Sequence, residues 1–368
     1  MSIQDELIVV DNDLDHLDNL KYKIASFDLD HTLINPKGKT IFPKNKDDWI
    51  LLPNVKEVLK HYVENNYKIV IFSNQGSKKS TAQDLIDKCN NISSELEIPI
   101  IYYLSIGKVF RKPNTKMYEY MIETKYKNDL SKQDIFYCGD ALGRENDFSD
   151  SDLKFALNLE MNIFTPEQIF QTNLINKYLP LIDNTCLAQN IKFKPFEYFN
   201  ESKFIQFETP TTREVIILVG PPASTKSTLA INYFPNYKYI NQDMLLTKSN
   251  CIKQFKVSLE KSNSNIIIDN TNKDIKTRNI WIDLIKKNNL EINVICIFID
   301  IPKHVVMHLN KYRSLTSNKN IPDIAIHSYY KNMETPSIEE GFDDIIIISK
   351  IDLNPLVKYS DLIVKYLI

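Results

Sequence analysis

The stretch KIASFDLDHT, residues 23–32, decides how the first half of the chain folds. Its apolar residues predict a buried strand that ends at Asp28 and Asp30. Side chains two residues apart on a regular strand point to the same side, so both carboxylates would project together. Two adjacent carboxylates repel each other unless a cation or a reaction uses them, and Mg²⁺ prefers such oxygen ligands. On these residues alone, two solvated loop acids remain the alternative.

Five more apolar runs end in the same way, at small or polar residues followed by a helical pattern. They are YKIVIFSN (67–74), DIFYCGD (134–140), EVIILVG (214–220), NIIIDNTN (265–272) and INVICIFID (292–300). Strands that alternate with helices predict parallel sheets with helices on both faces, and ligand sites beyond the carboxyl ends of the strands. The predicted fold class is therefore α/β, with two doubly wound domains.

The length of 368 residues also indicates two domains. Residues from about 172 to 212 lack the alternation of strand and helix and mix Asn, Pro, Thr and aromatic residues. We predict a first domain at 1–172, a connector at 173–212 and a second domain at 213–368. No repeat of 20 to 50 residues is visible in the sequence, which argues against a repeat architecture.

The charge balance of 45 Lys and Arg against 47 Asp and Glu excludes a protein that holds nucleic acid by a general positive field. Local basic patches would have to do so; the candidates are Lys44/Lys46, Lys78/Lys79 and Lys108/Arg111/Lys116. The five cysteines are dispersed and odd in number, which argues against a disulfide framework and indicates a reducing, intracellular compartment. We expect no signal peptide and no membrane span; nucleus and cytoplasm both remain open.

Further polar residues follow the later strands of the first half. Ser73 and Asn74 close one strand, Lys112 lies in FRKP (110–113), and Asp140 closes another strand. This order resembles the haloacid dehalogenase-like phosphatases. The resemblance implies a Rossmann-like phosphatase domain that works through an aspartyl phosphate.

The same resemblance implies a role for each residue. Asp28 would attack phosphorus, and Asp30 would act as general acid and base. Ser73, Asn74 and Lys112 would bind the transferred phosphoryl group, with Lys112 also stabilising charge. Asp140 would complete a Mg²⁺ site with Asp28 and the backbone carbonyl of Asp30.

Three further residues near these motifs remain open to interpretation. His31 stands where that family usually has Gly, which we interpret as a tolerated variation. Asp147 and Asp152 lie near the expected metal loop, where one could support the Mg²⁺ site and either could simply be solvated.

The second half contains GPPASTKST (220–228) directly after an apolar run. This is the spacing of a phosphate-binding loop for ATP. Backbone N–H groups of the loop and the following helix would hold the phosphates, Lys226 would reach the β and γ oxygens, and Ser227 would ligate Mg²⁺. The predicted ATP-binding residues are Gly220, Ser224, Thr225, Lys226, Ser227 and Thr228.

One position of this loop departs from the pattern, which asks for Gly where the chain has Thr225. A β-branched side chain there could crowd the phosphates or shift the loop, so a decayed loop is an alternative. Further along, Asp243 could accept the proton of an attacking hydroxyl, and Arg313 could cover the transferred phosphoryl group as a lid.

A phosphatase motif followed by a kinase loop resembles the polynucleotide kinase 3′-phosphatases. The resemblance runs from about residue 20 to 350 and includes CGDALGR (138–144), DFSDSDLKFALNL (147–159), HLNKYR (308–313) and ETPSIEEGFDDI (334–345). It implies removal of 3′-phosphate and ATP-dependent phosphorylation of 5′-hydroxyl, with Asp243 as base and Arg313 as lid. Gln242 stands where these kinases commonly carry Arg.

The resemblance also implies the partners. DNA strand ends in strand-break repair are the expected substrate, and RNA ends are possible. We expect a monomer without a forkhead-associated domain, and the sequence does not identify a ligase or repair scaffold. Two other functions stay open: a phosphatase of DNA ends or small molecules with a vestigial nucleotide-binding domain, and a non-catalytic scaffold that binds DNA ends.

Overall fold

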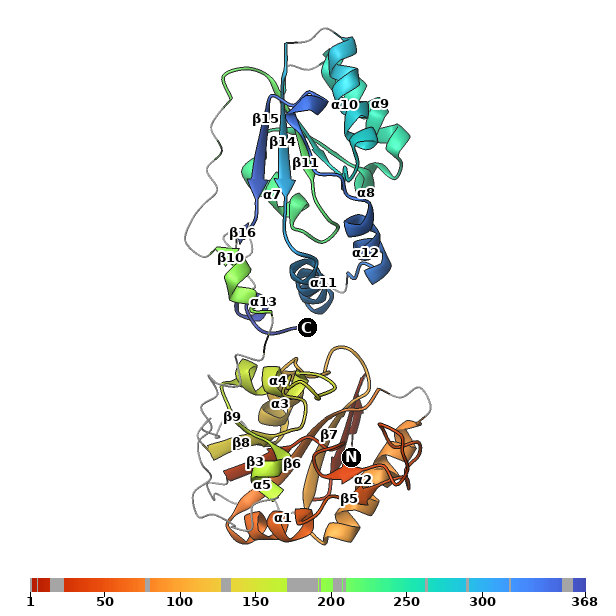
Figure 1. The fold of residues 1–368 in the computed structure, drawn as a ribbon, viewed down its shortest axis with the longest axis vertical. Coiled ribbons are helices and arrows are strands. Elements are labelled where there is room, and N and C mark those ends of the chain that lie inside the picture. The colour runs from red at the N-terminus through yellow and green to blue at the C-terminus, as the bar shows by residue number, and fades with distance from the viewer. Residues whose placement is uncertain are drawn as a thin grey trace. The chain divides into compact units, whose positions relative to one another are not determined.

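The computed structural model describes residues 2–4, 6–13, 23–76, 80–126, 134–170, 191, 193–200, 207, 210–261, 264–288, 291–317, 319–352 and 360–368. The chain divides into two compact units, residues 1–192 and 193–368 (Figure 1). Each unit is a sheet with helices, so the predicted α/β class is confirmed. The division falls inside the predicted connector, and residues 193–200 of that connector pair and pack with the second unit.

The first unit alternates strands and helices along the chain. Its elements are β1 (Ser2–Gln4), β2 (Leu7–Asp11), β3 (Lys23–Phe27), β4 (Ile34–Asn35), β5 (Ile50–Leu51), α1 (Val55–Glu64), β6 (Tyr67–Asn74), α2 (Ala82–Leu96), β7 (Ile100–Ser105), α3 (Lys116–Met121), the π-helical turn η1 (Ile122–Tyr126), β8 (Ile135–Cys138), α4 (Ser151–Leu159), β9 (Asn162–Phe164) and α5 (Pro166–Phe170). The strands predicted after residues 23, 67 and 134 are therefore present.

Seven of these strands form one sheet in the order β1-β2-β7-β6-β3-β8-β9. The five strands from β7 to β9 are parallel, whereas β2 is antiparallel to β7 and β1 to β2. The parallel arrangement expected from the alternation of strand and helix does not extend to this edge, where β1 and β2 form an antiparallel hairpin that needs no crossover helix. From β3 the chain adds β6 and β7 on one side and then β8 and β9 on the other. The carboxyl end of β3 is thus the switch point at which ligands bind in such sheets.

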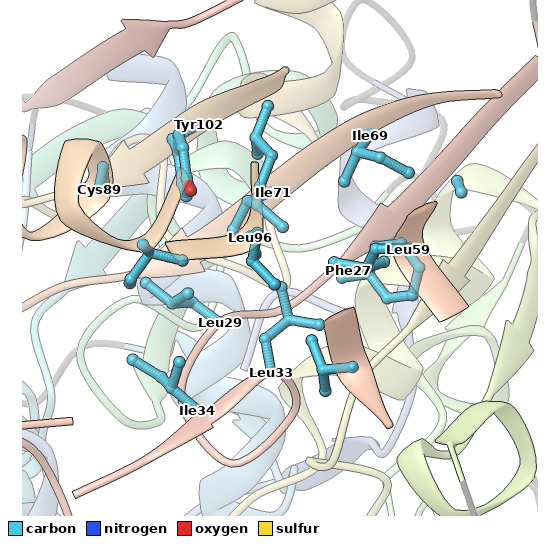
Figure 2. Packing of buried hydrophobic residues seen from close by; sticks show 14 of the residues in the cluster. Phe27, Leu29, Leu33, Ile34, Leu59, Ile69, Ile71, Cys89, Leu96 and Tyr102 are labelled. Carbon is cyan, nitrogen blue, oxygen red and sulfur yellow. The ribbon is translucent and has the colours of Figure 1, made fainter. Parts of the chain in front are cut away.

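Apolar side chains hold the end of β3 and the loop after it in place. Phe27, Leu29, Leu33 and Ile34 are at most 1% exposed and pack with residues of α1, β6 and α2 (Figure 2). Each buried side chain of this size contributes about 1.5–3 kcal/mol. Because these residues alternate with Asp28, Asp30 and the polar residues that follow, the core fixes the backbone that carries the carboxylates.

The second unit contains the other predicted strands. Its elements are the 3₁₀ turn η3 (Pro195–Tyr198), β10 (Phe199–Asn200), β11 (Glu214–Val219), α7 (Lys226–Tyr233), β12 (Lys238–Asn241), α8 (Gln242–Leu245), α9 (Lys248–Lys261), β13 (Ile266–Asp269), α10 (Ile275–Lys287), β14 (Asn293–Ile299), α11 (Lys303–Ser317), α12 (Asp323–Asn332), the 3₁₀ turn η4 (Ile338–Glu340), β15 (Asp344–Ile348), β16 (Ile351–Asp352) and α13 (Ser360–Ile363).

Its main sheet is wholly parallel, in the order β12-β13-β11-β14-β15. β11 is the central strand and is buried along its whole length. β13 and β14 flank it, so the loop from Gly220 to Thr225 leaves the sheet at its own switch point. In both halves of the chain, a functional loop therefore follows the strand at the switch point of the sheet.

A buried ion pair explains part of the ETPSIEEGFDDI stretch. The Arg278 guanidinium is fully buried and donates to both carboxylate oxygens of Glu340 at 2.7 Å, and also to the backbone carbonyls of Asn272 and Glu334. These contacts tie η4 to α10, so this stretch stabilises the second unit. Among the described residues, no helix is long and apolar enough to cross a membrane.

Candidate active sites

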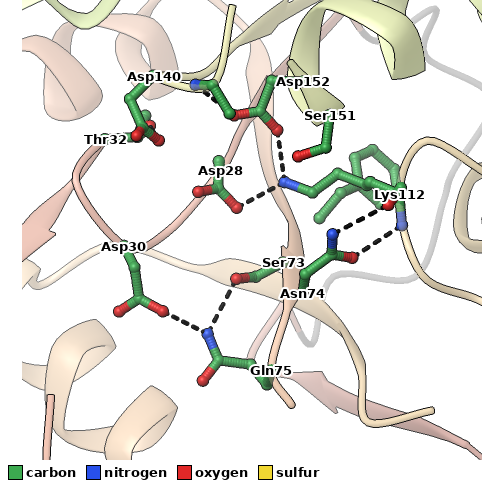
Figure 3. A network of polar contacts seen from close by, with 12 residues as sticks. Asp28, Asp30, Thr32, Ser73, Asn74, Gln75, Lys112, Asp140, Ser151 and Asp152 are labelled. Atoms are coloured by element: carbon green, nitrogen blue, oxygen red, sulfur yellow. Dashed lines mark hydrogen bonds and ion pairs between the residues drawn. The ribbon is translucent and has the colours of Figure 1, made fainter. Parts of the chain in front are cut away.

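Lys112 joins the functional groups of the first unit. Its ammonium donates to Asp28 Oδ1 at 2.6 Å and to Asp152 Oδ1 at 2.7 Å (Figure 3). It also donates to the Tyr137 hydroxyl at 2.7 Å. The Lys112 side chain is only 2% exposed, so its charge depends on these partners. Asn74 fixes the Lys112 backbone, because its amide oxygen accepts from the Lys112 N–H at 2.8 Å and its amide nitrogen donates to the Lys112 carbonyl. Residues far apart in sequence thus meet at the carboxyl ends of β3, β6 and β8.

Three carboxylates gather beside this lysine. One oxygen from each of Asp28, Asp140 and Asp152 lies within 4.8 Å of the other two. Burial, with the charge of Asp152, raises the pKa of the Asp140 carboxyl to about 7. Burial likewise raises the pKa of Asp28, although the Lys112 ammonium opposes the rise. A divalent cation would keep such carboxylates ionised, so the oxygen donors fit Mg²⁺.

Of the two acids that the sequence left open, Asp152 and not Asp147 belongs to this group. Asp152 Oδ2 accepts from the Ala141 N–H at 3.0 Å, which ties the start of α4 to the loop after Asp140. Asp147 accepts from Arg144 and from backbone N–H groups of its own loop. Asp147 therefore organises the loop, while Asp152 faces Lys112.

The Asp30 side chain points away from the three carboxylates. Its Oδ2 accepts from Gln75 Nε2 at 2.6 Å, and its Oδ1 lies 3.1 Å from Lys88 Nζ. Gln75 also donates to Ser73 Oγ at 3.0 Å, which links Asp30 to the end of β6 (Figure 3). The Asp30 side chain is thus separate from the acidic group, and the predicted metal contact of its backbone carbonyl stays a prediction.

A small cavity and a wider cleft open above these residues. The cavity, of about 80 Å³, is lined by Asp28, Ser73, Lys112, Asp140 and Asp152 among others. The cleft, of about 520 Å³, shares Asp30, Asn74, Arg111, Phe42 and Phe148 with the cavity. The Phe42 and Phe148 rings meet edge to face at 5.6 Å, and Phe148 is 73% exposed. The cleft therefore leads from solvent, past two aromatic rings, to the carboxylates.

Some residues of the predicted basic patches line this cleft, and others do not. Lys46 lines it and forms an ion pair with Asp87 at 2.8 Å, and Arg111 lines both spaces. Lys78 and Lys79 lie outside the described residues. Within the described part of the chain, Arg111 and Lys46 are thus the members of the predicted patches that reach the cleft.

In the second unit, the predicted phosphate loop lines a cavity of about 310 Å³ that continues over Leu309, Tyr312 and Arg313 of α11. Arg313 therefore faces the same space as Ser224, Lys226 and Ser227. The Lys226 ammonium donates to the loop's own carbonyls, at 3.0 Å to Gly220 and 2.5 Å to Pro221. Burial lowers the pKa of Lys226 to about 8, against the opposing charges of Asp269 and Asp243.

Asp269 is the polar hub of the second unit. The Ser227 hydroxyl donates to its Oδ2 at 2.6 Å, the Tyr239 hydroxyl at 2.5 Å and the Asn241 amide at 2.9 Å. This buried carboxylate beside the loop serine is a second place where a Mg²⁺ ion that accompanies a nucleotide could be held. Asp243 lies in α8, two residues after Asn241, and is exposed. It does not line the cavity of about 310 Å³ beside the phosphate loop.

Thr225 and His31, the two residues that stand where the resembled families have Gly, both have left-handed backbone. φ is 66° at Thr225 and 62° at His31. His31 Nδ1 lies 3.0 Å from Asn35 Oδ1, and its ring packs edge to face on Phe42 at 5.6 Å. His is among the residues enriched in this conformation, whereas a β-branched residue is an outlier there. The predicted disturbance of the phosphate loop by Thr225 therefore arises partly from its backbone conformation.

Sequence reasoning assigned no role to Tyr137, Gln75, Lys88 or Tyr239, and noted Asp269 without a function. Gln75 follows Ser73 and Asn74 directly, so its place beside the site could have been predicted. Lys88 also left a signal, because it interrupts the apolar face of a helix. The contacts of Tyr137 and Tyr239 depend on tertiary structure and had no sequence signal.

Known proteins resemble this chain both over most of its length and over its first unit alone. The profile of the family described as "Polynucleotide kinase 3 phosphatase" matches residues 23–170. A Schizosaccharomyces pombe protein named "Bifunctional polynucleotide phosphatase/kinase" is 37% identical over 336 residues, covering 88% of this chain and 78% of that protein. An Acanthamoeba polyphaga mimivirus protein named "Putative bifunctional polynucleotide phosphatase/kinase" is 32% identical, covering 88% and 83%. A Saccharomyces cerevisiae "Polynucleotide 3'-phosphatase" is 30% identical and covers 43% of this chain and 90% of its own.

Proposed function

The chain belongs to the family of bifunctional polynucleotide phosphatase/kinases, and from this premise we propose that it heals nucleic-acid ends. It removes phosphate from a 3′ end and transfers the γ-phosphate of ATP to a 5′-hydroxyl. The observation that carries the proposal is the contact of Lys112 with Asp28 and Asp152 at the switch point of the first sheet, beside Asp140. This arrangement suits a nucleophilic aspartate next to charge-neutralising groups.

The phosphatase reaction proceeds in two steps. An oxygen of Asp28 attacks phosphorus, the bond from phosphorus to O3′ breaks, and the proton on Asp30 passes to O3′. This leaves a 3′-hydroxyl and an aspartyl phosphate. Water then attacks phosphorus while Asp30 takes its proton, the bond to Asp28 breaks, and inorganic phosphate leaves. Ser73, Asn74 and Lys112 surround the transferred group.

The proposed metal is Mg²⁺, held by Asp28, Asp140 and Asp152. When bound, Mg²⁺ supplies positive charge that offsets the negative charge of the phosphoryl oxygens. Asp152 also orients Lys112, since its two oxygens face the lysine and the Ala141 N–H. The carboxylates thus hold both the ion and the lysine in place.

Residues of the cleft support a nucleic-acid substrate. Arg111 is a cation that can bind a backbone phosphate at the mouth of the cavity, and Phe42 and Phe148 offer ring surface to an unpaired base. A single-stranded 3′ end carries both groups, whereas a sugar phosphate carries neither. We propose DNA ends in strand-break repair as the main substrate, with RNA ends possible. We further propose a monomeric enzyme in a reducing intracellular compartment.

In the second unit, Lys226 and the loop from Gly220 to Thr228 bind the phosphates of ATP. Ser227 and Asp269 hold the accompanying Mg²⁺, Asp243 accepts the proton of the 5′-hydroxyl, and Arg313 covers the transferred group. The lining shared by the loop and Arg313 supports this assignment. The absence of Arg at position 242 removes one expected contact to phosphate, because Gln242 is uncharged.

A second candidate is a 3′-phosphatase whose kinase site no longer works. The left-handed backbone of Thr225 and the contacts of Lys226 to its own loop favour it. Two assays on the purified chain separate the candidates: release of phosphate from a 3′-phosphorylated oligonucleotide, and transfer of labelled phosphate from ATP to a 5′-hydroxyl oligonucleotide. Both activities support the full proposal, and the first alone supports the second candidate. Preference for sugar or nucleotide monophosphates would refute both.

A further inference from the structure

Lys88 lies on the buried face of α2. This helix begins with a capping box between Thr81 and Asp84, and its buried face includes Leu85, Cys89 and Ile92. The Lys88 side chain, on the same face, is only 5% exposed. A buried ammonium among apolar neighbours costs several kcal/mol unless a counter-charge compensates it. A lysine at this place therefore needs a partner.

The partner of Lys88 is Asp30. Lys88 Nζ lies 3.1 Å from Asp30 Oδ1, and Gln75 Nε2 donates to Asp30 Oδ2 at 2.6 Å. Both oxygens of one carboxyl are thus held, one from α2 and one from the residue that follows β6. Among the described residues, Lys88 is the cation that forms an ion pair with Asp30.

We propose that Lys88 is a positioning residue that holds the Asp30 carboxyl on the leaving-group side of the cleft. The inference rests on the proposed phosphatase reaction, in which Asp30 gives its proton to O3′ and later takes one from water. Lys88 neither gives nor takes a proton in either step.

The geometry gives each reacting acid its own lysine. Lys112 binds Asp28 and Asp152, while Lys88 binds Asp30, whose side chain is separate from the acidic group. Proton transfer needs a heavy-atom distance of about 2.6–3.2 Å. Without Lys88, one Asp30 oxygen loses its partner and the carboxyl can rotate, so fewer bound substrates find the acid in reach of O3′.

A double-mutant cycle tests the proposal in the full chain. Lys88→Met should slow single-turnover release of the 3′-hydroxyl oligonucleotide about 10- to 100-fold at saturating substrate. The same change in an Asp30→Asn background should have almost no further effect, because the group that Lys88 positions is already gone. Lys88→Arg, which keeps the charge, should recover most of the rate.

Lys68→Met is the matched control. Lys68 is 11% exposed and pairs with the buried Asp13 at 2.8 Å, but it lies near the start of β6, away from the cleft at the end of that strand. Its loss should leave the single-turnover rate unchanged. If Lys88→Met does not fold, Lys88→Gln runs the same cycle with a neutral polar side chain.

The leaving group offers an independent readout. 4-Nitrophenolate leaves without a proton, so Lys88→Met should slow single-turnover release from 4-nitrophenyl phosphate much less than release from the oligonucleotide. Equal losses with both substrates, an undiminished loss in the Asp30→Asn background, or no loss at all would each overturn the proposal. An undiminished loss would show that Lys88 contacts the substrate itself.

The proposed function can fail separately. If the wild-type chain does not dephosphorylate 3′-phosphate ends but hydrolyses an alkyl phosphate such as glycerol phosphate, the proposal of a polynucleotide substrate is refuted. The Lys88 and Asp30 cycle would then be measured on that alkyl phosphate, with the same criteria.

Discussion

The two units hold their functional lysines in different ways. In the first unit, Lys112 contacts the side chains of Asp28, Tyr137 and Asp152, which come from three other segments of the chain. In the second unit, Lys226 contacts carbonyl oxygens of its own loop. The first site is therefore assembled by the tertiary fold, whereas a phosphate that binds the second must compete with the loop for its lysine.

The difference extends to the backbone. Both functional loops contain residues with φ above 60°, namely His31 in the first unit and Ala223 and Thr225 in the second. The His31 side chain is used, since it contacts Asn35 and Phe42. Thr225 is the N-cap residue of α7, but its side chain forms no capping hydrogen bond. The first loop gains contacts from the His31 side chain. The second loop carries backbone strain at Thr225, whose side chain provides no compensating capping hydrogen bond.

The largest expected effects come from removing the Asp28 nucleophile of the first unit or the Lys226 ammonium of the second, one at a time. Asp28→Asn should lower 3′-phosphate release by about 10⁴-fold or more, as expected for loss of a nucleophile, and spare transfer to 5′-hydroxyl ends. Lys226→Ala should do the reverse. Loss of both activities from either change would contradict two separate sites. Assays of both activities on each variant decide.

The next largest effect should come from the carboxylates of the first unit. Asp152→Asn removes a charge that contacts Lys112 and belongs to the proposed Mg²⁺ site, so 3′-phosphate release should fall about 100-fold and require more Mg²⁺. Asp147→Asn is the control, because Asp147 contacts its own loop and not Lys112. Equal Mg²⁺ requirements for the two variants would remove Asp152 from the metal site.

The three carboxylates should also make the stability of the first unit depend on pH. The second unit should not show the same dependence. The raised pKa of Asp140, about 7, means that the folded protein keeps a proton that the unfolded chain releases near pH 4. Without metal, the free energy of unfolding should therefore fall as pH rises from about 4 to about 7. Bound Mg²⁺ replaces the proton, so it should raise the Tm more at pH 8 than at pH 5.

Thermal unfolding with EDTA or Mg²⁺ over this pH range measures the effect. Asp140→Asn should weaken both the pH dependence and the response to Mg²⁺. A response to Mg²⁺ that is equal at pH 5 and pH 8 would argue against a metal at these carboxylates.

Most of the fold could be predicted from the sequence. The central strands β3, β6, β8, β11, β13 and β14 are buried on both faces, and such strands leave continuous apolar runs that end at polar loops. The outer strands of the first sheet left weaker signals. β1, β2 and β9 are short, and the antiparallel hairpin of β1 and β2 stands outside the alternation of strand and helix that guided the prediction.

The site could be predicted where a residue lies at the end of a strand or just after it. Asp28 follows β3, Ser73 and Asn74 end β6, Asp140 comes two residues after β8, and the phosphate loop follows β11; strand ends of this kind converge by topology. The remainder depends on packing. Asp147 and Asp152 could not be told apart from the sequence, and the contact of Asp152 with Lys112 distinguishes them. The pairing of Lys88 with Asp30 across 58 residues likewise needs the helix to be docked on the sheet.

The smallest expected effects concern the left-handed backbone at Thr225 and His31. Replacing each residue with Gly should change the stability of its unit in opposite directions. A left-handed backbone costs a non-Gly residue about 1–2 kcal/mol, and Gly costs about 0.5–1 kcal/mol in chain entropy. Thr225→Gly should therefore stabilise the second unit by up to about 1 kcal/mol. His31→Gly should destabilise the first, because His tolerates this backbone better and loses its contacts with Asn35 and Phe42.

Calorimetry of the full chain and assays of both activities measure this pair of variants. If the Thr225 strain opposes the shape that binds ATP, its release should also raise kinase turnover or affinity, by about fivefold for 1 kcal/mol. A more stable second unit with an unchanged kinase would show that the strain lies outside the reaction, and that the contacts of Lys226 with its own loop limit the enzyme instead. Destabilisation by Thr225→Gly would mean that the Thr225 side chain contributes more than its backbone costs, and the two loops would then be alike.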